Sequence, residues 1–363
     1  MQTGDEQIYI DGDQFFEKMH EAIRAAQNTI YLETYIFDQD NLGLKTLKVL
    51  AEAAARGVKV HLLIDGVGSS HWTFHDAQMY RAQGIELKFF HPLAWQRHPS
   101  AILMSLTLQR ILTGFYKLNH RNHRKICIVD EKILFICSMN VSDRHLKSIS
   151  GELAWRDTGV QVTDEAVVRE YLETCREAWE YPQQFFGRRW VVARRQKKKA
   201  HRKILNLIHS AKQQIWITNP YFVPDFQLFR GLAKAARSGL DVKILVPMHS
   251  DIFGLKFAMQ GFYTALLKKG CQIFEYRPSI LHAKILIVDN WASVGSTNLD
   301  YRSIFYNLEA DLILAEPKNI QLVKDQFVQD LKVSNPIILH EWNQRSWYKK
   351  ILQRFFLFFR GAF

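Results

Sequence analysis

The sequence predicts an α/β protein of two pseudo-symmetric lobes, each a mixed, mostly parallel sheet flanked by helices, that share one active site. Three observations predict this fold class. A pattern of histidine, lysine and aspartate occurs twice, at His123 and at His282. Two helix-to-strand junctions also recur, at residues 28–32 and 53–60 in the first half and at 213–217 and 234–242 in the second. Finally, 363 residues exceed what one core usually covers, and a repeat of half the chain indicates a duplicated domain.

The junctions predict alternating helices and strands. At each of them the end of an amphipathic helix is followed by an apolar, β-favouring run. Such alternation is typical of a sheet with helices packed on its faces. We therefore expect a first lobe at residues 1–190, a second lobe at 191–340 and a basic amphipathic helix at 341–363.

The repeated pattern is built around a short buried strand. Residues 126–129 and 285–288 are apolar runs that end in aspartate and a polar turn. Positions two apart in a strand share a face, so each copy presents one imidazole and one ammonium side by side: His123 with Lys125, and His282 with Lys284. The aspartates of the pattern, Asp130 and Asp289, have the opposite parity and are better placed to brace the frame.

An imidazole beside an ammonium suits phosphodiester chemistry, because phosphoryl transfer depends mainly on positioning and on charge that offsets the phosphate oxygens. With two histidines at one phosphorus, one can attack while the other protonates the leaving oxygen and then activates the incoming hydroxyl. The lysines can serve where a metal otherwise would, so neither a metal nor a cofactor is expected. The two turns add candidate phosphate-binding side chains: Ser138, Asn140, Ser296 and Asn298.

An attacking histidine needs an orienting partner at its other nitrogen. A carboxylate that opens an apolar run follows each copy, Asp157 after the first and Glu309 after the second. We take both as candidate orienting groups. The alternative is that they are acids at strand edges that face water.

These residues resemble the signature of the phospholipase D superfamily, a duplicated H-x-K-x4-D followed by a G-S-x-N turn. Both copies match, except that Cys137 stands where the pattern has glycine, which would cost about 1 kcal/mol if the position needs positive φ. The resemblance implies a catalytic set of His123, Lys125, Asp130, His282, Lys284 and Asp289. Residues 31–36, 219–224 and 295–303 are further similar to bacterial cardiolipin synthases, and the layout is closest to the short B type.

The resemblance implies transfer of a phosphatidyl group from a phospholipid donor to phosphatidylglycerol through a phosphohistidine. It favours His123 as the nucleophile and His282 as the acid and base. The donor is left open between phosphatidylglycerol and phosphatidylethanolamine. A phospholipase D-type hydrolase acting on phospholipid or nucleic acid is the alternative, and a catalytically silent lipid-binding scaffold is a further one.

Bulk properties bear on the partners. The net charge of +12 suits an anionic partner, and we expect phospholipid and a membrane surface in place of nucleic acid. Four cysteines without a C-x-x-C pair fit a reducing setting, and no run approaches the ~20 apolar residues of a spanning helix. We therefore expect a peripheral protein on the cytoplasmic face of the bacterial cell membrane. The oligomeric state is open.

Three segments could meet lipid. An insert at about 92–119, before the first catalytic strand, combines apolar and cationic residues; a core helix is the alternative. The basic run 194–203 is either solvated or attracted to lipid. In the carboxyl-terminal helix, an apolar side and a cationic side are typical of a helix at an anionic bilayer surface, although packing on the protein's own core is possible. The apolar side holds Trp347, Tyr348, Ile351, Leu352, Phe355, Phe358 and Phe359.

Overall fold

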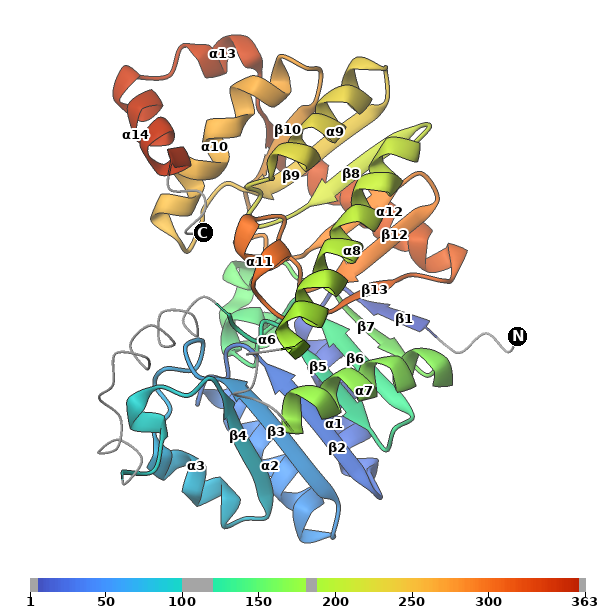
Figure 1. The fold of residues 1–363 in the computed structure, drawn as a ribbon, viewed down its shortest axis with the longest axis vertical. Helices are drawn as coiled ribbons and strands as arrows, with labels where there is room; N and C mark the ends of the chain where they lie inside the picture. The colour runs from blue at the N-terminus through green and yellow to red at the C-terminus, as the bar shows by residue number, and fades with distance from the viewer. Residues whose placement is uncertain (1–5, 100–119, 181–187, 359–363) are drawn as a thin grey trace. The chain divides into compact units, whose positions relative to one another are not determined.

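The computed structural model describes residues 6–99, 120–180 and 188–358, and it divides the chain into two compact units (Figure 1). The first unit comprises Met1–Ser150, Thr158–Gly187 and Tyr306–Ala310. The second comprises Gly151–Asp157, Arg188–Phe305 and Asp311–Phe363. Each unit therefore includes a short segment from the other half of the sequence, which a simple division near residue 190 does not anticipate.

The first unit contains a seven-stranded sheet in the order β1-β7-β6-β5-β2-β3-β4. Its strands are β1 (Glu6–Tyr9), β2 (Thr29–Thr34), β3 (Lys59–Asp65), β4 (Ile85–Phe90), β5 (Ile126–Val129), β6 (Ile133–Cys137) and β7 (Gly159–Val162). The central strand β5 pairs antiparallel with β2, with Ile126 opposite Glu33. Because of this register, the chain that enters β5 and the chain that leaves β2 lie at the same edge of the sheet.

The helices of the first unit begin at side-chain caps. Asp11 accepts a hydrogen bond from the backbone N–H of Gln14 at the start of α1, and Asp40 does the same for Gly43 in α2. The helical elements are α1 (Gly12–Ala25), α2 (Asn41–Ala55), α3 (Phe74–Arg81), η1 (Ala94–Gln96), η2 (Asp143–His145), α6 (Lys147–Ser150) and α7 (Glu165–Glu180). The apolar faces of α1 and α2 pack into one core with strands β2 and β3.

The second unit repeats the plan, with a seven-stranded sheet in the order β13-β12-β11-β8-β9-β10-β14. Its strands are β8 (Gln214–Thr218), β9 (Asp241–Pro247), β10 (Gln272–Tyr276), β11 (Ile285–Val288), β12 (Trp291–Gly295), β13 (Asp311–Ile313) and β14 (Ser334–Pro336). Its helical elements are η3 (Gly151–Leu153), α8 (Arg188–Ser210), α9 (Phe226–Arg237), α10 (Phe253–Leu267), α11 (Tyr301–Phe305), α12 (Pro317–Lys332), α13 (Leu339–Asn343) and α14 (Trp347–Phe358). Strand β11 is the counterpart of β5, and it pairs antiparallel with β8 in the same way.

The predicted class of two related α/β lobes with mixed sheets is confirmed, but the sheets are not mostly parallel. Among the described strands of each sheet, two neighbouring pairs are parallel and four are antiparallel. The physical reason is visible at β5–β6 and β11–β12. The turns between these strands are too short for the crossover that parallel pairing requires.

The three segments that could meet lipid differ in what the structure describes. Most of the insert, residues 100–119, lies outside the described residues. The basic run 194–203 is part of helix α8, in which Lys198 and Lys199 are exposed and His201 is buried against Asp225. Helix α14 packs against α10. Within the described residues, every helix is too short or too polar to span a bilayer.

Candidate active site

The first half-site lies where the chain enters β5. His123 is buried, and its Nδ1 is 2.9 Å from Oε2 of Glu309. The backbone N–H of His123 donates to the carbonyl of Leu308 at 2.9 Å, and Leu308 forms a parallel bridge with Asn122. The segment around Leu308 is thereby held beside the histidine. Lys125 donates from Nζ to the carbonyl of His123 at 2.7 Å, and the ring of Tyr35 meets the imidazole edge-on with 5.0 Å between centroids.

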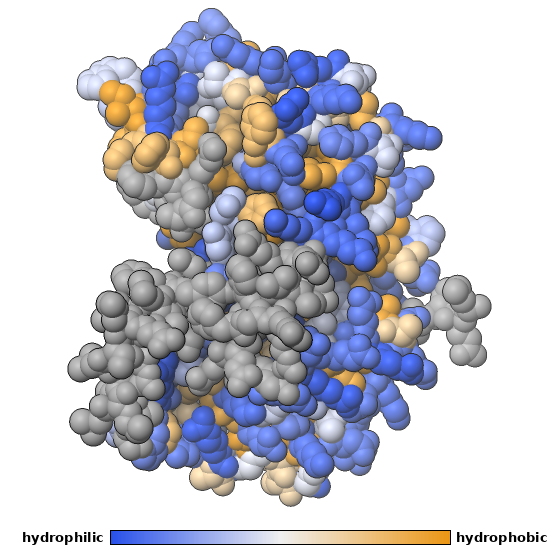
Figure 2. Space-filling model, in the orientation of Figure 1, coloured by the Kyte–Doolittle hydropathy of each residue, from blue (hydrophilic) through white to orange (hydrophobic). Residues whose placement is uncertain are grey.

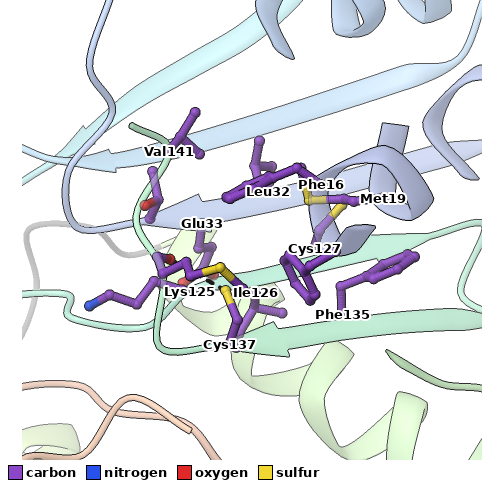
Figure 3. Close-up of a pocket in the computed structure, with 13 residues that line it drawn as sticks. Phe16, Met19, Leu32, Glu33, Lys125, Ile126, Cys127, Phe135, Cys137 and Val141 are labelled. Atoms are coloured by element: carbon purple, nitrogen blue, oxygen red, sulfur yellow. Dashed lines mark hydrogen bonds between the residues drawn. The ribbon is translucent and has the colours of Figure 1, made fainter. Parts of the chain in front are cut away.

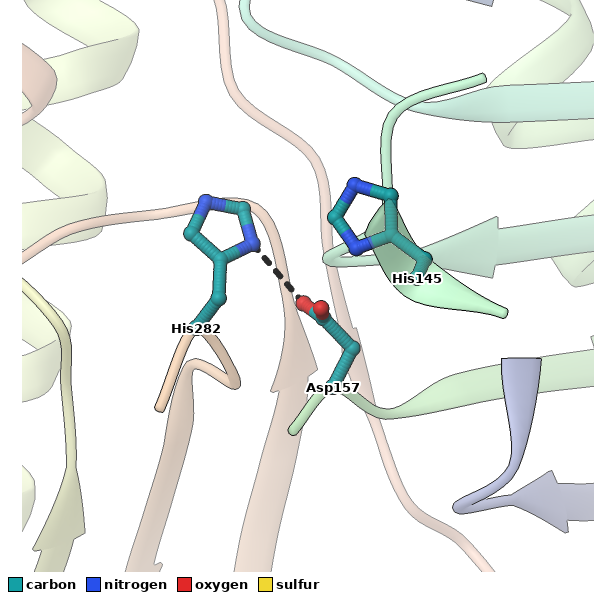
Figure 4. A group of neighbouring side chains, drawn as sticks. All are labelled: His145, Asp157 and His282. Atoms are coloured by element: carbon teal, nitrogen blue, oxygen red, sulfur yellow. Dashed lines mark hydrogen bonds and ion pairs between the residues drawn. The ribbon is translucent and has the colours of Figure 1, made fainter. Parts of the chain in front are cut away.

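The second half-site has the same construction at β11. His282 is buried, and its Nδ1 is 2.8 Å from Oδ1 of Asp157 (Figure 4). The backbone N–H of His282 donates to the carbonyl of Arg156 at 2.8 Å, so residues 151–157 run beside it. Two aromatic rings approach the imidazole, Trp155 at 5.1 Å and Tyr221 at 6.5 Å between centroids.

The orienting carboxylates are thus exchanged between the two repeats. In the sequence, Asp157 follows the first motif and Glu309 follows the second, yet Asp157 binds His282 and Glu309 binds His123. Both carboxylates are buried with their histidines and are not strand-edge acids facing water. A carboxylate at Nδ1 keeps the proton of the neutral ring on that nitrogen, which leaves the lone pair on Nε2.

Lys284 supports this tautomer in the second half-site. Its Nζ lies 2.8 Å from Nε2 of His282 and 2.6 Å from the carbonyl of the same residue. An ammonium can only donate hydrogen bonds, so Nε2 is the acceptor. His282 is therefore arranged with a proton on Nδ1 and a lone pair on Nε2.

The two motif aspartates bind backbone. Asp130 accepts hydrogen bonds from the N–H groups of residues 27, 28 and 29, and Asp289 accepts from those of residues 212, 213 and 214. Both adopt the left-handed conformation, with φ of 51° and 50°. Partial burial raises the pKa of each carboxyl, but the three N–H donors outweigh it and the pKa is lowered.

This position separates each aspartate from the histidine and lysine of its motif. Lys125 precedes β5 and Asp130 follows it, and five residues of extended chain span about 16 Å. Asp130 and Asp289 were grouped with the catalytic residues by resemblance. The catalytic grouping stays a prediction. The contacts of the two aspartates fit the bracing role that their strand parity predicts, because each fixes the turn that leads into the neighbouring strand.

The turn after β6 shows what Cys137 does. Neither Cys137 nor its counterpart Gly295 has positive φ, so the cysteine causes no backbone strain. Its Sγ lies 3.3 Å from the carbonyl of Met139. Figure 3 shows Cys137 in the wall of a small apolar cavity with Cys127, while the ammonium of Lys125 points away from it. The thiol therefore belongs to the core behind the half-site.

The four candidate phosphate-binding side chains are all buried. Ser138 exchanges hydrogen bonds with the backbone of Thr158, and Oδ1 of Asn140 accepts from the N–H of Ile36, so both hold the first turn in place. In the second turn, Oδ1 of Asn298 has no hydrogen-bond partner among the described residues. Since a buried amide oxygen normally accepts a hydrogen bond, Oδ1 of Asn298 can take a donor from a ligand, such as a hydroxyl, but not a phosphate oxygen.

A buried charge network that the sequence did not reveal holds the first half-site. Arg121 donates to Asp65 from Nε at 2.9 Å and from Nη2 at 2.6 Å, and both side chains are almost completely buried. Arg124 pairs with Glu33 at 2.7 Å. These pairs fix the segment on both sides of His123. The signal in the sequence was two arginines within a stretch that has no acid between Glu86 and Asp130.

The duplicated fold and the paired His–Lys half-sites define a phospholipase D-like protein. A family model described as "Cardiolipin synthase, PLD-like domain" matches residues 19–179 and 204–331. The chain belongs to this family, and the resemblance seen in the sequence is thereby confirmed.

Named relatives are similar over most of the chain. A cardiolipin synthase of Halalkalibacterium halodurans is 31% identical over 373 residues, which cover 95% of this chain and 70% of the relative. Cardiolipin synthase 1 of Bacillus cereus is 32% identical over 375 residues, with 96% and 70% covered.

Solved structures share the fold. Phosphatidylserine synthase of Haemophilus influenzae has a TM-score of 0.73 at 14% identity, covering 99% of this chain and 95% of that one. Polyphosphate kinase of Porphyromonas gingivalis has a TM-score of 0.59 at 11% identity, covering 90% and 50%.

Proposed function

We propose that this chain is a phosphatidyltransferase of the cardiolipin synthase type. It would move a phosphatidyl group from a phospholipid donor to a hydroxyl of phosphatidylglycerol through a phosphohistidine, with both half-sites acting on one phosphorus. The observation that carries the proposal is the pair of buried His–Lys sets of matching construction, each with a carboxylate at Nδ1 of its histidine.

In the first step, Nε2 of His123 attacks the donor phosphorus. The new N–P bond replaces the bond from phosphorus to the headgroup oxygen. For this step Nε2 of His282 carries a proton in place of the hydrogen bond that it accepts from Lys284, and it gives that proton to the headgroup oxygen. Glu309 supports the nucleophile by keeping the proton of His123 on Nδ1, and buried Asp157 stabilises the imidazolium form of His282.

In the second step, His282 is neutral and its Nε2 takes the proton of the acceptor hydroxyl. The hydroxyl oxygen attacks phosphorus, the N–P bond breaks, and His123 is released. Lys125 and Lys284 would offset the charge on the phosphate oxygens in both steps. The side chain of Asn298 leaves Oδ1 without a partner among the described residues, and because an amide oxygen only accepts, we expect it to receive the hydrogen bond of a substrate hydroxyl and not to bond a phosphate oxygen.

The substrates that we propose are phosphatidylglycerol as acceptor and either phosphatidylglycerol or phosphatidylethanolamine as donor. The excess of cations over acids favours anionic lipid at a membrane surface, and we place the protein at the cytoplasmic face of the bacterial cell membrane. Water in place of the acceptor hydroxyl would give phosphatidic acid, so a phospholipase D-type hydrolase is the second candidate.

The test is to incubate the full chain with defined vesicles and to identify the products by mass. Phosphatidylglycerol alone and phosphatidylglycerol with phosphatidylethanolamine are the two substrate mixtures. We expect cardiolipin from wild type, and a loss of at least about 1000-fold in His123→Ala and in His282→Ala. His75→Ala is the matched control, because this histidine is exposed and away from both motifs.

The outcomes separate the candidates. Phosphatidic acid without cardiolipin would support the hydrolase. Full activity in His282→Ala would refute the proposed chemistry. Peptide mass spectrometry of the quenched enzyme should find one phosphatidyl group per chain on His123, and an adduct on each of the two histidines in one chain would refute action on a single phosphorus.

A further inference from the structure

Helix α14 carries a row of exposed apolar side chains, which we call the α14 stripe: Trp347, Tyr348, Ile351, Phe355 and Phe358. Their exposed fractions are 73%, 51%, 54%, 55% and 84%. Figure 2 shows the corresponding apolar surface over α14, at the upper left of the view. Large apolar side chains are rarely gathered at this exposure without a binding role.

The opposite side of α14 is fixed to α10. Gln353 is 2% exposed, donates to Gln260 at 3.2 Å and accepts from Arg345 at 2.9 Å. Phe356 stacks on Phe257 with 5.8 Å between centroids. At 100° per residue, the stripe covers an arc of about 100° whose centre is about 180° from the residues that face α10. The helix is therefore docked through a partly polar side, and its apolar stripe is directed away from α10.

One cation adjoins the stripe: at 100° per residue, Arg354 falls next to Trp347 and Phe358, whereas Lys349 falls on the other side of the helix. Lys349 and Arg354 are exposed on α14, and no acidic residue follows Glu341 in the sequence. Tryptophan and tyrosine at the start of the stripe are the residues that favour the interface between water and lipid headgroups. An exposed apolar row with cations and without acids complements an anionic bilayer.

The stripe also leads toward the second half-site. Phe356 lies beside Phe257, and Arg345 lies beside Thr264, so α14 runs antiparallel to α10 and its last turn points to the start of α10. The loop before α10 exposes Ile252 and contains Asp251. Asp251 accepts hydrogen bonds from the hydroxyl of Tyr221, whose ring is 6.5 Å from that of His282.

We propose that the α14 stripe is the surface by which the chain docks on an anionic phospholipid bilayer. The last turn of α14, which lies at the start of α10, would direct lipid toward His282. This inference rests on the proposed function, because a phosphatidyltransferase must take its substrate from a bilayer. A second copy of the chain is a poorer occupant. A two-fold contact through the stripe would bring the like charge of Arg354 close to its copy.

Vesicle binding of the full chain tests the proposal. The stripe variant is Trp347→Gln with Ile351→Gln, Phe355→Gln and Phe358→Gln, since glutamine is a good helix former and all four side chains are exposed. The matched control, Leu322→Gln with Ile313→Gln, changes side chains of the same unit that are 37% and 57% exposed and lie off α14. Co-sedimentation uses vesicles of phosphatidylglycerol with phosphatidylcholine and vesicles of phosphatidylcholine alone.

We expect wild type and the control to bind phosphatidylglycerol vesicles with affinities within about twofold, and the stripe variant to bind at least about 100-fold more weakly. Lys349→Gln with Arg354→Gln should lower binding to phosphatidylglycerol vesicles about tenfold and leave binding to phosphatidylcholine unchanged. Phosphatidyl transfer in detergent–lipid micelles should be equal in all variants, which shows that each one is folded.

Two results would overturn the proposal: a stripe variant that binds vesicles as wild type does, or a wild type that does not bind. Sedimentation velocity tests whether a second copy of the chain binds the stripe instead. A wild-type dimer that becomes monomeric in the stripe variant without a change in vesicle binding would assign the surface to self-association. Failure of the proposed function is distinguishable, because wild type would then give no transfer product in micelles whatever its affinity for vesicles.

Discussion

Replacing Asp157 by asparagine removes one charge and almost no volume from the second half-site. The carboxylate is 2.8 Å from Nδ1 of His282, and the side chains are 2% and 4% exposed. The substitution Asp157→Asn keeps a polar partner at Nδ1 of His282. It therefore isolates what the negative charge contributes when His282 carries its proton.

The magnitude follows from the geometry. Two unit charges about 4 Å apart interact by about 4 kcal/mol at an effective dielectric constant of about 20. Because the asparagine dipole retains part of this interaction, we expect a loss of about 2–4 kcal/mol in stabilisation of the protonated ring. This corresponds to a fall of about 30- to 1000-fold in the rate of phosphatidyl transfer.

The assay is the initial rate of cardiolipin formation in micelles, measured beside thermal unfolding to confirm the fold. Asp325→Asn, an exposed carboxylate on α12, is the control and should stay within about twofold of wild type. Glu309→Gln tests the equivalent contact to His123. A folded Asp157→Asn protein that transfers phosphatidyl groups within threefold of the wild-type rate would refute the assignment of Asp157 as the group that supports His282.

Three further predictions concern stability. Asp130→Gly keeps the left-handed backbone but removes the carboxylate that accepts three N–H groups, so urea unfolding should show a loss of roughly 2 kcal/mol. Because the folded-state pKa of Asp130 is lowered, this difference should be full above pH 5 and shrink as the pH falls through the folded-state pKa. Burial, with Lys45 as a smaller cause, lowers the pKa of His20 to about 4. Because the unfolded chain then takes up a proton before the folded protein does, the unfolding free energy of wild type should fall by about 2 kcal/mol between pH 7 and pH 5, and that of His20→Gln should not. Parallel pH profiles of the two proteins would contradict this. Glu33→Ala leaves Arg124 buried without its carboxylate and should cost about 3–5 kcal/mol, part of which the double variant with Arg124→Ala should restore in thermal unfolding.

The sequence was sufficient for features that depend on neighbouring residues. The apolar runs at 126–129 and 285–288 are strands β5 and β11 because four consecutive apolar, β-favouring residues have few other ways to be buried. His123 with Lys125, and His282 with Lys284, are two residues apart at the entry to these strands, so their joint position follows from the backbone repeat. The bracing role of Asp130 and Asp289 could be expected from the same parity.

The amphipathic pattern of residues 347–358 was equally visible, but not the side through which the helix docks. Gln353 lies on the polar side of the helix in the sequence pattern, yet it is buried against α10, and the aromatic stripe is exposed. A helical wheel orders residues around an axis and contains no information on the neighbouring surface. The direction of the strands was misjudged for a related reason, since helix-to-strand junctions reveal the parallel pairs and say little of the hairpins.

By itself, the sequence determined the duplicated α/β plan, the two pairs of histidine and lysine, and the chemistry that they suit. The tertiary structure decided which carboxylate serves which histidine. His123 and Glu309 are 186 residues apart, and His282 and Asp157 are 125 apart. Such pairs form because short segments add to a strand entry in the other half of the sequence, as Leu308 does beside Asn122. Contacts over these separations depend on how the whole sheet closes, and no local pattern of side chains encodes them.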